Sequence, residues 1–194
     1  MTKKLAKIIS RIFEPTFEIP IILIVATSTA YLNGYRWRFL ALLLFLDAIL
    51  PGLYFLYLLK TKKAKDWDLS RRKDRLPLFK FATACHLAGV LVAFLINREP
   101  LAQILLAFWF LALIFTAITN YWKISLHSGV NSTLAVFAIL MYGPNTRAWL
   151  LLLLPIIVSW ARIAYKKHDL LQVVAGALVP MIILPLFFWA FGII

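Results

Sequence analysis

The chain has 194 residues, 63% of them hydrophobic, and its mean hydropathy is +0.87. A soluble domain of this length cannot bury so much apolar surface, so a soluble fold is excluded, and the same composition excludes disorder. The formal charge of +13 comes from 21 Lys and Arg residues against 8 Asp and Glu. In a membrane protein, anionic lipid headgroups and insertion topology explain this charge better than nucleic acid. The single cysteine, Cys85, excludes a disulfide scaffold.

The N-terminal segment, residues 1–16, predicts a short amphipathic helix lying in the membrane interface. Leu5, Ile8 and Ile12 recur at helical spacing, and Lys and Arg residues lie between them. A signal peptide is the competing interpretation. The apolar run is too interrupted for one, and no small-residue cleavage site follows it convincingly.

Seven apolar segments follow, most of them close to the length of about 20 residues that a spanning helix needs. They cover residues 18–33, 38–60, 78–97, 101–121, 125–142, 147–164 and 170–192. The first is short and contains Pro20, so we expect six or seven transmembrane helices. The connections leave no room for a second domain. Residues 1–194 are therefore predicted to form one all-α, polytopic membrane helical bundle, which is compatible with a homo-oligomer.

Lys and Arg residues are divided unevenly between the two sides of these spans. One side holds only Arg36, Arg38, Arg98 and Arg147, and the other side holds all the rest. The positive-inside rule places the basic side, with the N-terminus, in the cytoplasm. We therefore expect a multi-pass protein of the cell membrane whose basic face is cytoplasmic.

The first polar cluster of that face is the loop 63–77, which contains Lys65, Arg72 and Arg75. One interpretation is a basic loop that touches anionic lipid. The other is a phosphate clamp, because the planar guanidinium group matches two phosphate oxygens.

The second cluster is residues 121–129, where Lys123 and His127 are expected one helical turn apart on one face. Ser125 is expected to cap the helix start, which leaves backbone N–H groups available to an anion. An ordinary helix start with a snorkelling lysine is the alternative interpretation.

The third cluster is residues 160–176. Arg162 closes one span, and His168 and Gln172 are expected to open the next with i,i+4 spacing. The alternative is a basic turn followed by a histidine at a helix start. Two histidines beside arginines favour phosphoryl transfer: one imidazole attacks phosphorus, the other protonates the leaving oxygen, and the arginines neutralise the phosphoryl oxygens. No metal site and no cofactor are predicted, because the acidic residues lie among basic ones.

His86 and Asp47 lie well inside predicted spans. His86 is expected to be a hydrogen-bonded structural residue. Asp47 is expected to accept hydrogen bonds inside the bundle, with part of the site floor as the alternative.

Taken together, the clusters resemble the type-2 phosphatidic acid phosphatase superfamily, whose motifs are KxxxxxxRP, PSGH and SRxxxxxHxxxD. The third motif is matched by Arg162 and His168, and the second by Ser125 and His127. The first motif is matched only in part. Lys65 and Arg72 keep its KxxxxxxR spacing but lack the proline, whereas Arg75 is an Arg near a proline. The resemblance covers about residues 60–180.

The resemblance implies a role for each matched residue. His168 would be the nucleophile that forms a phosphohistidine, and His127 would be the general acid. The phosphate would be bound by basic and hydroxyl side chains, namely Arg162, Arg72, Arg75, Lys65, Lys123 and Ser125. The substrate would be a phosphorylated lipid, such as phosphatidate, phosphatidylglycerophosphate or a polyprenyl diphosphate.

One departure from the family lies next to the expected nucleophile. The family's third-motif Asp is Gln172 here, which can accept a hydrogen bond from His168 but supplies no charge. Asp169 is expected to point elsewhere on the helix, which makes it a poor substitute.

Three functions remain open at this point. The first is a metal-independent lipid phosphatase. The second is a catalytically inactive homologue that binds or transports anionic lipid. The third is an intramembrane prenyltransferase, for which residues 66–68 supply one thin Asp-rich match and no second motif exists.

Overall fold

The computed structural model describes residues 2–29, 35–96, 99–143 and 147–194, and within these ranges it is helical with no strand. The all-α prediction is therefore confirmed for the described chain. The helices are α1 (Thr2–Ile12), α2 (Pro15–Thr29), α3 (Arg36–Leu44), η1 (Phe45–Ile49), α4 (Leu50–Lys60), α5 (Arg72–Leu95), α6 (Leu101–Tyr121), α7 (Leu126–Tyr142), η2 (Arg147–Leu152), α8 (Leu153–Ala164) and α9 (Leu170–Ala190).

Five helical segments are long and apolar enough to cross a membrane, which is compatible with an integral membrane protein. They are Arg36–Lys60, Arg72–Leu95, Leu101–Tyr121, Arg147–Ala164 and Leu170–Ala190. Helix α7 is apolar but shorter, at 17 residues, and α2 has 15. Each predicted span contains a helix. The ends of the spans at residues 30–33 and 97, and Arg98 of the orientation argument, lie outside the described residues.

The chain divides into two compact units, each described here by itself. Unit 1 comprises Met1–Ile22 and Ile124–Ile194, and unit 2 comprises Leu23–Lys123. The boundary falls within α2. A single domain over the whole chain stays a prediction.

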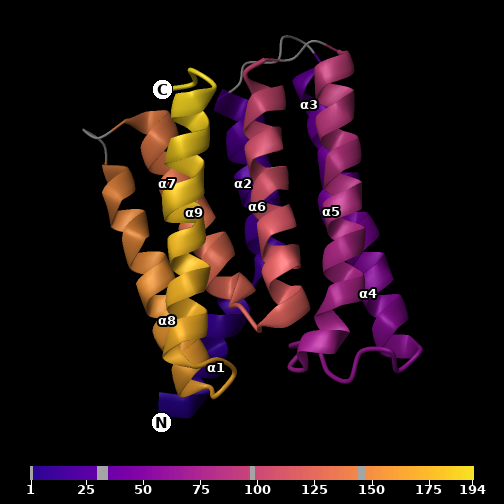
Figure 1. The fold of residues 1–194 in the computed structure, drawn as a ribbon, viewed down its shortest axis with the longest axis vertical. Helices are drawn as coiled ribbons and strands as arrows, with labels where there is room; N and C mark the ends of the chain where they lie inside the picture. Colours follow the sequence, from indigo (N-terminus) through magenta and orange to yellow (C-terminus); the bar gives the residue numbers. More distant parts are fainter. Residues whose placement is uncertain (1, 30–34, 97–98, 144–146) are drawn as a thin grey trace. The chain divides into compact units, whose positions relative to one another are not determined.

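In unit 1, helices α7, α8 and α9 pack side by side, and α1 packs against α8 (Figure 1). Phe137 of α7 and Phe188 of α9 are fully buried and meet edge to face, with ring centroids 6.1 Å apart. Such aromatic contacts add to the burial of apolar area in holding two helices together.

Helix α1 occupies the predicted N-terminal amphipathic segment. Its buried residues are Ala6 and Ser10, whereas its apolar residues Leu5, Ile8 and Ile12 are exposed. The helix therefore packs through its small residues and leaves its large apolar side chains uncovered. Its position in a membrane interface stays a prediction.

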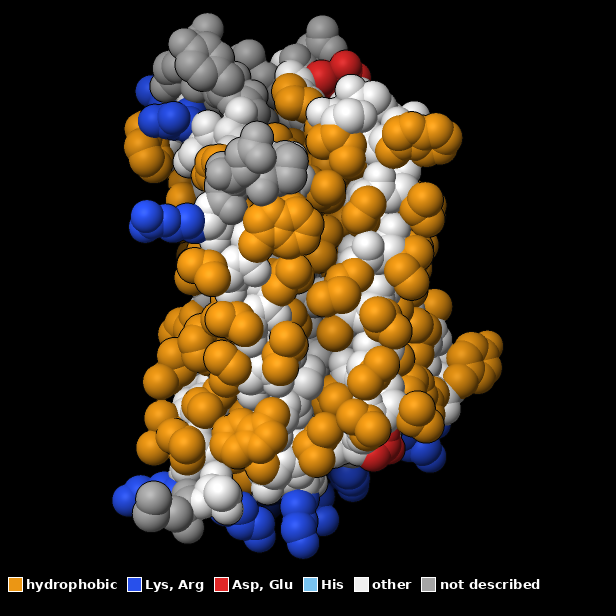
Figure 2. Space-filling model, turned by 90° about the vertical axis from the view of Figure 1, so that its left-hand side faces the viewer, with side chains coloured by type: hydrophobic (Ala, Val, Ile, Leu, Met, Phe, Trp, Pro, Cys, Tyr) orange, Lys and Arg blue, Asp and Glu red, His pale blue; other side chains and the backbone are white. Residues whose placement is uncertain are grey.

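Exposed apolar side chains are also found on the spanning segments. On α8, for example, Leu153, Ile156 and Trp160 are all exposed. Figure 2 shows hydrophobic side chains spread along the face that it presents, with Lys and Arg side chains at its lower end and others at its upper left. An apolar band bounded by charge is typical of a lipid-facing surface.

In unit 2, α5 packs against α6 and α4, and polar contacts join these apolar helices. Asp47 lies in the π-helical segment η1, and its Oδ2 is 2.9 Å from His86 Nδ1 on α5. His86 Nε2 donates to the carbonyl oxygen of Leu105 on α6, at 3.0 Å. His86 therefore connects three segments of the bundle, as expected for a structural residue, and Asp47 is its internal partner.

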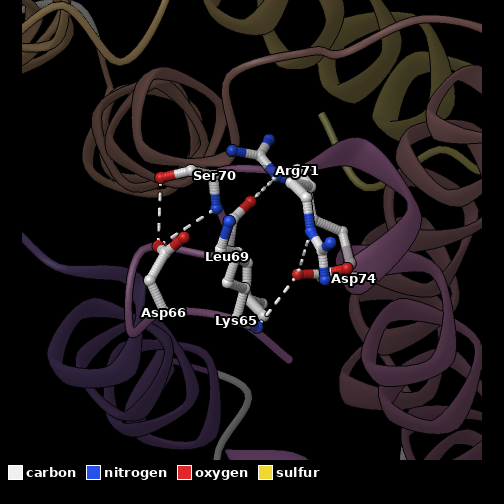
Figure 3. A network of polar contacts seen from close by, with 7 residues as sticks. Lys65, Asp66, Leu69, Ser70, Arg71 and Asp74 are labelled. Atoms are coloured by element: carbon white, nitrogen blue, oxygen red, sulfur yellow. Dashed lines mark hydrogen bonds and ion pairs between the residues drawn. The ribbon is translucent and has the colours of Figure 1, made fainter. Parts of the chain in front are cut away.

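The basic loop between α4 and α5 is held by two acidic residues, Asp66 in the loop and Asp74 in the first turn of α5 (Figure 3). Asp74 Oδ2 accepts from the backbone N–H of Lys65 and from Arg71 Nε, each at 3.0 Å. Asp66 Oδ1 accepts from the backbone N–H and the hydroxyl of Ser70, at 3.2 and 3.0 Å. Local carboxylate contacts thus give this loop a defined conformation despite its high positive charge.

Candidate functional site

The sequence-predicted site residues fall into two groups that belong to different units. Unit 1 holds Ser125, His127, Arg162, His168 and Gln172. Unit 2 holds the remaining four, Lys65, Arg72, Arg75 and Lys123.

Arg162 and His168 are brought together by the turn that ends α8. Lys166 adopts a left-handed conformation, with φ of 57°. Its N–H donates to the carbonyl of Ile163 at 2.8 Å, and the N–H of Lys167 donates to the carbonyl of Arg162 at 3.0 Å. This pair of bonds is a Schellman motif, which reverses the chain at a helix C-terminus.

The reversal places His168 directly after the turn, with its N–H 3.4 Å from the carbonyl oxygen of Arg162. Arg162 is only 1% exposed and is the largest fully buried side chain in the described residues. His168 is buried as well. With five residues between them, Arg162 and His168 therefore place a buried guanidinium and a buried imidazole at the two ends of one turn.

His168 lies before α9 rather than inside it, because the helix begins at Leu170. The expectation that His168 opens the helix is wrong by two residues. The contact expected from i,i+4 spacing nevertheless exists: His168 Nδ1–H donates to Gln172 Oε1 at 2.7 Å. The side chain of Gln172 reaches back over the helix start to hold the ring.

Asp169 is the N-cap of α9, and both of its carboxylate oxygens contact Gln172. Oδ1 accepts from the backbone N–H of Gln172 at 2.9 Å, and Oδ2 accepts from Gln172 Nε2 at 2.7 Å. The expectation that Asp169 points away from this group is therefore wrong. Its extended backbone, with ψ of 173°, turns the carboxylate toward the first turn of the helix.

Helix α7 begins beside this turn. Ser125 is its N-cap, and Ser125 Oγ accepts from the backbone N–H of Ser128 at 3.3 Å, as the sequence predicts. The backbone N–H of Ser125 donates to the carbonyl of Gln172 at 3.1 Å. The second and third sequence clusters are thus joined directly, main chain to main chain.

Gly176 makes this close approach geometrically possible. A Cβ at this position would lie 2.5 Å from the carbonyl oxygen of Ser125, which is too close for any other residue without a backbone shift. Gly176 therefore matters because it has no side chain, since any side chain would force α9 away from the start of α7.

A chain of serine hydroxyls, which sequence reasoning missed, links α7 to α8. Ser128 Oγ donates to Ser125 Oγ at 3.0 Å, and Ser159 Oγ donates to Ser128 Oγ at 3.0 Å. Ser159 precedes Arg162 by three residues, so the two share a face of α8. That spacing was a visible signal for Ser159.

His127 lies in the first turn of α7, half-buried. Its carbonyl oxygen accepts from Asn131 Nδ2 at 2.9 Å, and the same amide donates to Glu18 Oε2 on α2 at 2.6 Å. Glu18 and Asn131 are both buried and were not identified from the sequence. Lys123 precedes α7, which begins at Leu126, so the expectation that Lys123 and His127 share one helix is wrong.

The predicted basic residues of unit 2 make structural contacts. Arg72 Nη1 donates to the carbonyls of Thr119 and Asn120 at the C-terminal end of α6. Arg75 is buried, and its Nε donates to the carbonyl of Leu69 at 2.8 Å. Arginines commonly satisfy the open carbonyls of a helix end in this way. Their binding of phosphate stays a prediction.

The described residues contain no group of three or more His, Cys, Asp or Glu side chains that could hold a metal ion. No family model matches the chain, and no curated protein or solved structure matches it either.

Proposed function

We propose that the chain is a divergent member of the type-2 phosphatidic acid phosphatase superfamily and acts as a membrane-embedded, metal-independent lipid phosphatase or diphosphatase. One observation carries the proposal: Arg162, His168 and Gln172 are assembled around the turn between α8 and α9, and Gln172 bonds to Ser125 at the start of α7. The proposal rests on unit 1. The phosphate-binding role of Lys65, Arg72, Arg75 and Lys123 is predicted from the sequence.

In the proposed mechanism, His168 is the nucleophile. Because Gln172 Oε1 can only accept, His168 carries its proton on Nδ1, and Nε2 carries the lone pair. Nε2 attacks phosphorus and a P–N bond forms as the bond from phosphorus to the leaving oxygen breaks. His127 donates its proton to that oxygen.

Water completes the reaction. It attacks the phosphohistidine, with His127 now accepting a proton, and the P–N bond breaks to release inorganic phosphate. In this mechanism Arg162 neutralises charge on the phosphoryl oxygens, and its burial supports that role because a buried guanidinium is stabilised by an anion. The N-terminus of α7 adds backbone dipoles of the same sense.

The substrate we propose is a lipid with a terminal phosphate monoester or diphosphate. The exposed apolar side chains of the spanning segments support a membrane location. We propose six or seven spans in the cell membrane, an interfacial α1, and a site on the cytoplasmic side. A lipid tail could then stay among the apolar helices while its headgroup reaches the polar turn.

The test is phosphate release by the detergent-purified chain in the presence of EDTA. The substrates are phosphatidate, phosphatidylglycerophosphate and a polyprenyl diphosphate, each run beside His168→Ala. Lys166→Ala is the matched control, because it removes an exposed side chain from the same turn. We expect release by the parent chain and the control, and none by His168→Ala.

The other outcomes identify the alternatives. Headgroup binding without turnover, insensitive to either histidine, would replace the phosphatase with an anionic-lipid-binding or transport protein. In a parallel assay without EDTA, activity that disappears when EDTA is added would favour a metal-dependent reaction such as prenyl transfer. Release that persists in His168→Ala would overturn the role of His168.

A further inference from the structure

Every hydrogen-bonding group of Gln172 is engaged by a described partner. Its N–H and Nε2 both donate to Asp169, at 2.9 and 2.7 Å. Its carbonyl oxygen accepts from the N–H of Ser125 at 3.1 Å, and its Oε1 accepts from His168 at 2.7 Å. The side-chain amide therefore bridges an exposed carboxylate and a buried imidazole.

From this arrangement we infer that Asp169 is a positioning residue that sets the protonated nitrogen of His168 through the amide of Gln172. The argument depends on which groups can donate. An ionised carboxylate only accepts hydrogen bonds, so the amide must turn Nε2 toward Asp169. The same rotation leaves Oε1 as the atom that faces His168.

The amide oxygen then imposes a choice on the imidazole. Because Oε1 only accepts, the neutral ring of His168 carries its proton on Nδ1 and its lone pair on Nε2. This inference rests on the proposed function, where Nε2 attacks phosphorus. A Gln free to rotate would allow the opposite tautomer, in which Nε2 is protonated and cannot attack.

The charge of Asp169 has a second consequence. A donor amide hydrogen-bonded to a carboxylate is polarised, which makes its carbonyl oxygen a better acceptor. Asp169 therefore supports the imidazolium character that develops on His168 without touching it. Asp169 and Gln172 together do what one directly bonded carboxylate would do.

The main variant is Asp169→Asn, which removes the acceptor-only group and keeps the cap. Asn is as good an N-cap as Asp, so the start of α9 should persist. The Asn amide can donate to Gln172, which allows the Gln172 amide to flip. We expect kcat to fall at least about 10-fold, because a histidine held in the wrong tautomer is a poor base or nucleophile, with KM and the melting temperature unchanged.

The rescue variant is Asp169→Asn combined with Gln172→Glu, which keeps the length of the side chain that reaches His168. The new carboxylate at position 172 accepts from His168 Nδ1 directly, so the tautomer no longer depends on position 169. We expect kcat to recover to within about fivefold of the parent chain, because the group that orients His168 is restored.

A readout independent of catalysis is the ¹⁵N spectrum of histidine-labelled protein. The chain has three histidines, so the spectrum contains the signals of three imidazoles. The signals that disappear in His168→Ala are those of His168. We expect the His168 ring protonated on Nδ1 in the parent chain. In Asp169→Asn we expect a shift toward Nε2 protonation, which the double variant reverses.

The results separate the inference from the proposed function. An unchanged tautomer in Asp169→Asn would overturn the inference, and so would a fall in kcat that follows the melting temperature and is not rescued. If Asp169→Asn shifts the tautomer but the parent chain releases no phosphate from any lipid, the inference is supported and the proposed function is refuted.

Discussion

His86 and His168 are both buried histidines with an acceptor at Nδ1, yet their surroundings differ in kind. His86 lies within α5, and its two nitrogens contact Asp47 at 2.9 Å and the Leu105 carbonyl at 3.0 Å. His168 lies in a turn, where a neutral amide holds Nδ1 and the carboxylate is one contact further away. The first arrangement joins helices. The second orients a ring at the end of a helix pair.

The largest expected effects come from replacing each histidine by Ala. His168→Ala should reduce phosphate release at least about 10³-fold, as loss of a nucleophile does, and leave the melting temperature almost unchanged. His86→Ala should lower the free energy of unfolding by about 3 kcal/mol, because it leaves a buried carboxylate without its partner. Activity and thermal unfolding of both variants are measured in the same detergent.

The reverse result for the two variants would contradict the roles assigned to His86 and His168. If His86→Ala abolished turnover in folded protein while His168→Ala retained it, the reactive histidine would be in unit 2, and the assignment of His168 would be wrong.

Gly176 and Gly52 offer the next test, since both are glycines within helices. Gly176→Ala should cost about 1–3 kcal/mol, because the added Cβ meets the Ser125 carbonyl oxygen at 2.5 Å. Gly52→Ala meets nothing within 4 Å and should stabilise the chain by about 0.5–1 kcal/mol. Thermal unfolding measures both, and equal stability changes would contradict the tight docking of α9 on α7.

Asp74→Asn tests whether the basic loop of unit 2 owes its conformation to the chain's own carboxylates. Asp74 accepts two hydrogen bonds, so the variant should cost about 1–2 kcal/mol and loosen residues 61–71. The measurement is the rate of trypsin cleavage within this Lys-rich segment, which should rise. An unchanged rate with unchanged stability would show that other contacts hold the loop.

The smallest effects are expected at two equivalent turns, one in each unit. Lys62 and Lys166 both follow a helix end with positive φ, 58° and 57°. Replacing either by Gly should add roughly 0.5–1 kcal/mol of stability, because Gly adopts this conformation without steric cost. Thermal unfolding of the two variants should give equal shifts, and Lys166→Gly should leave turnover unchanged.

The sequence by itself determined the elements and their ends to within a few residues in most cases. The segment 101–121 coincides with α6, and Ser125 caps α7 as its side chain predicts. The segment 170–192 extends two residues past α9. These features are local: apolar runs set the length of a helix, and capping side chains act on backbone groups three residues away. The His168–Gln172 contact, expected from i,i+4 spacing, also forms, although His168 lies before the helix and not inside it.

Only the tertiary structure decided which local features meet. The Ser125–Gln172 bond exists because α7 and α9 pack closely at Gly176. Asn131 donates a hydrogen bond to Glu18, which is 113 positions away in the chain. Such contacts depend on how helices pack, which the order of residues in one segment does not encode. The sequence therefore identified the candidate chemical groups, and packing selected the partners that orient them.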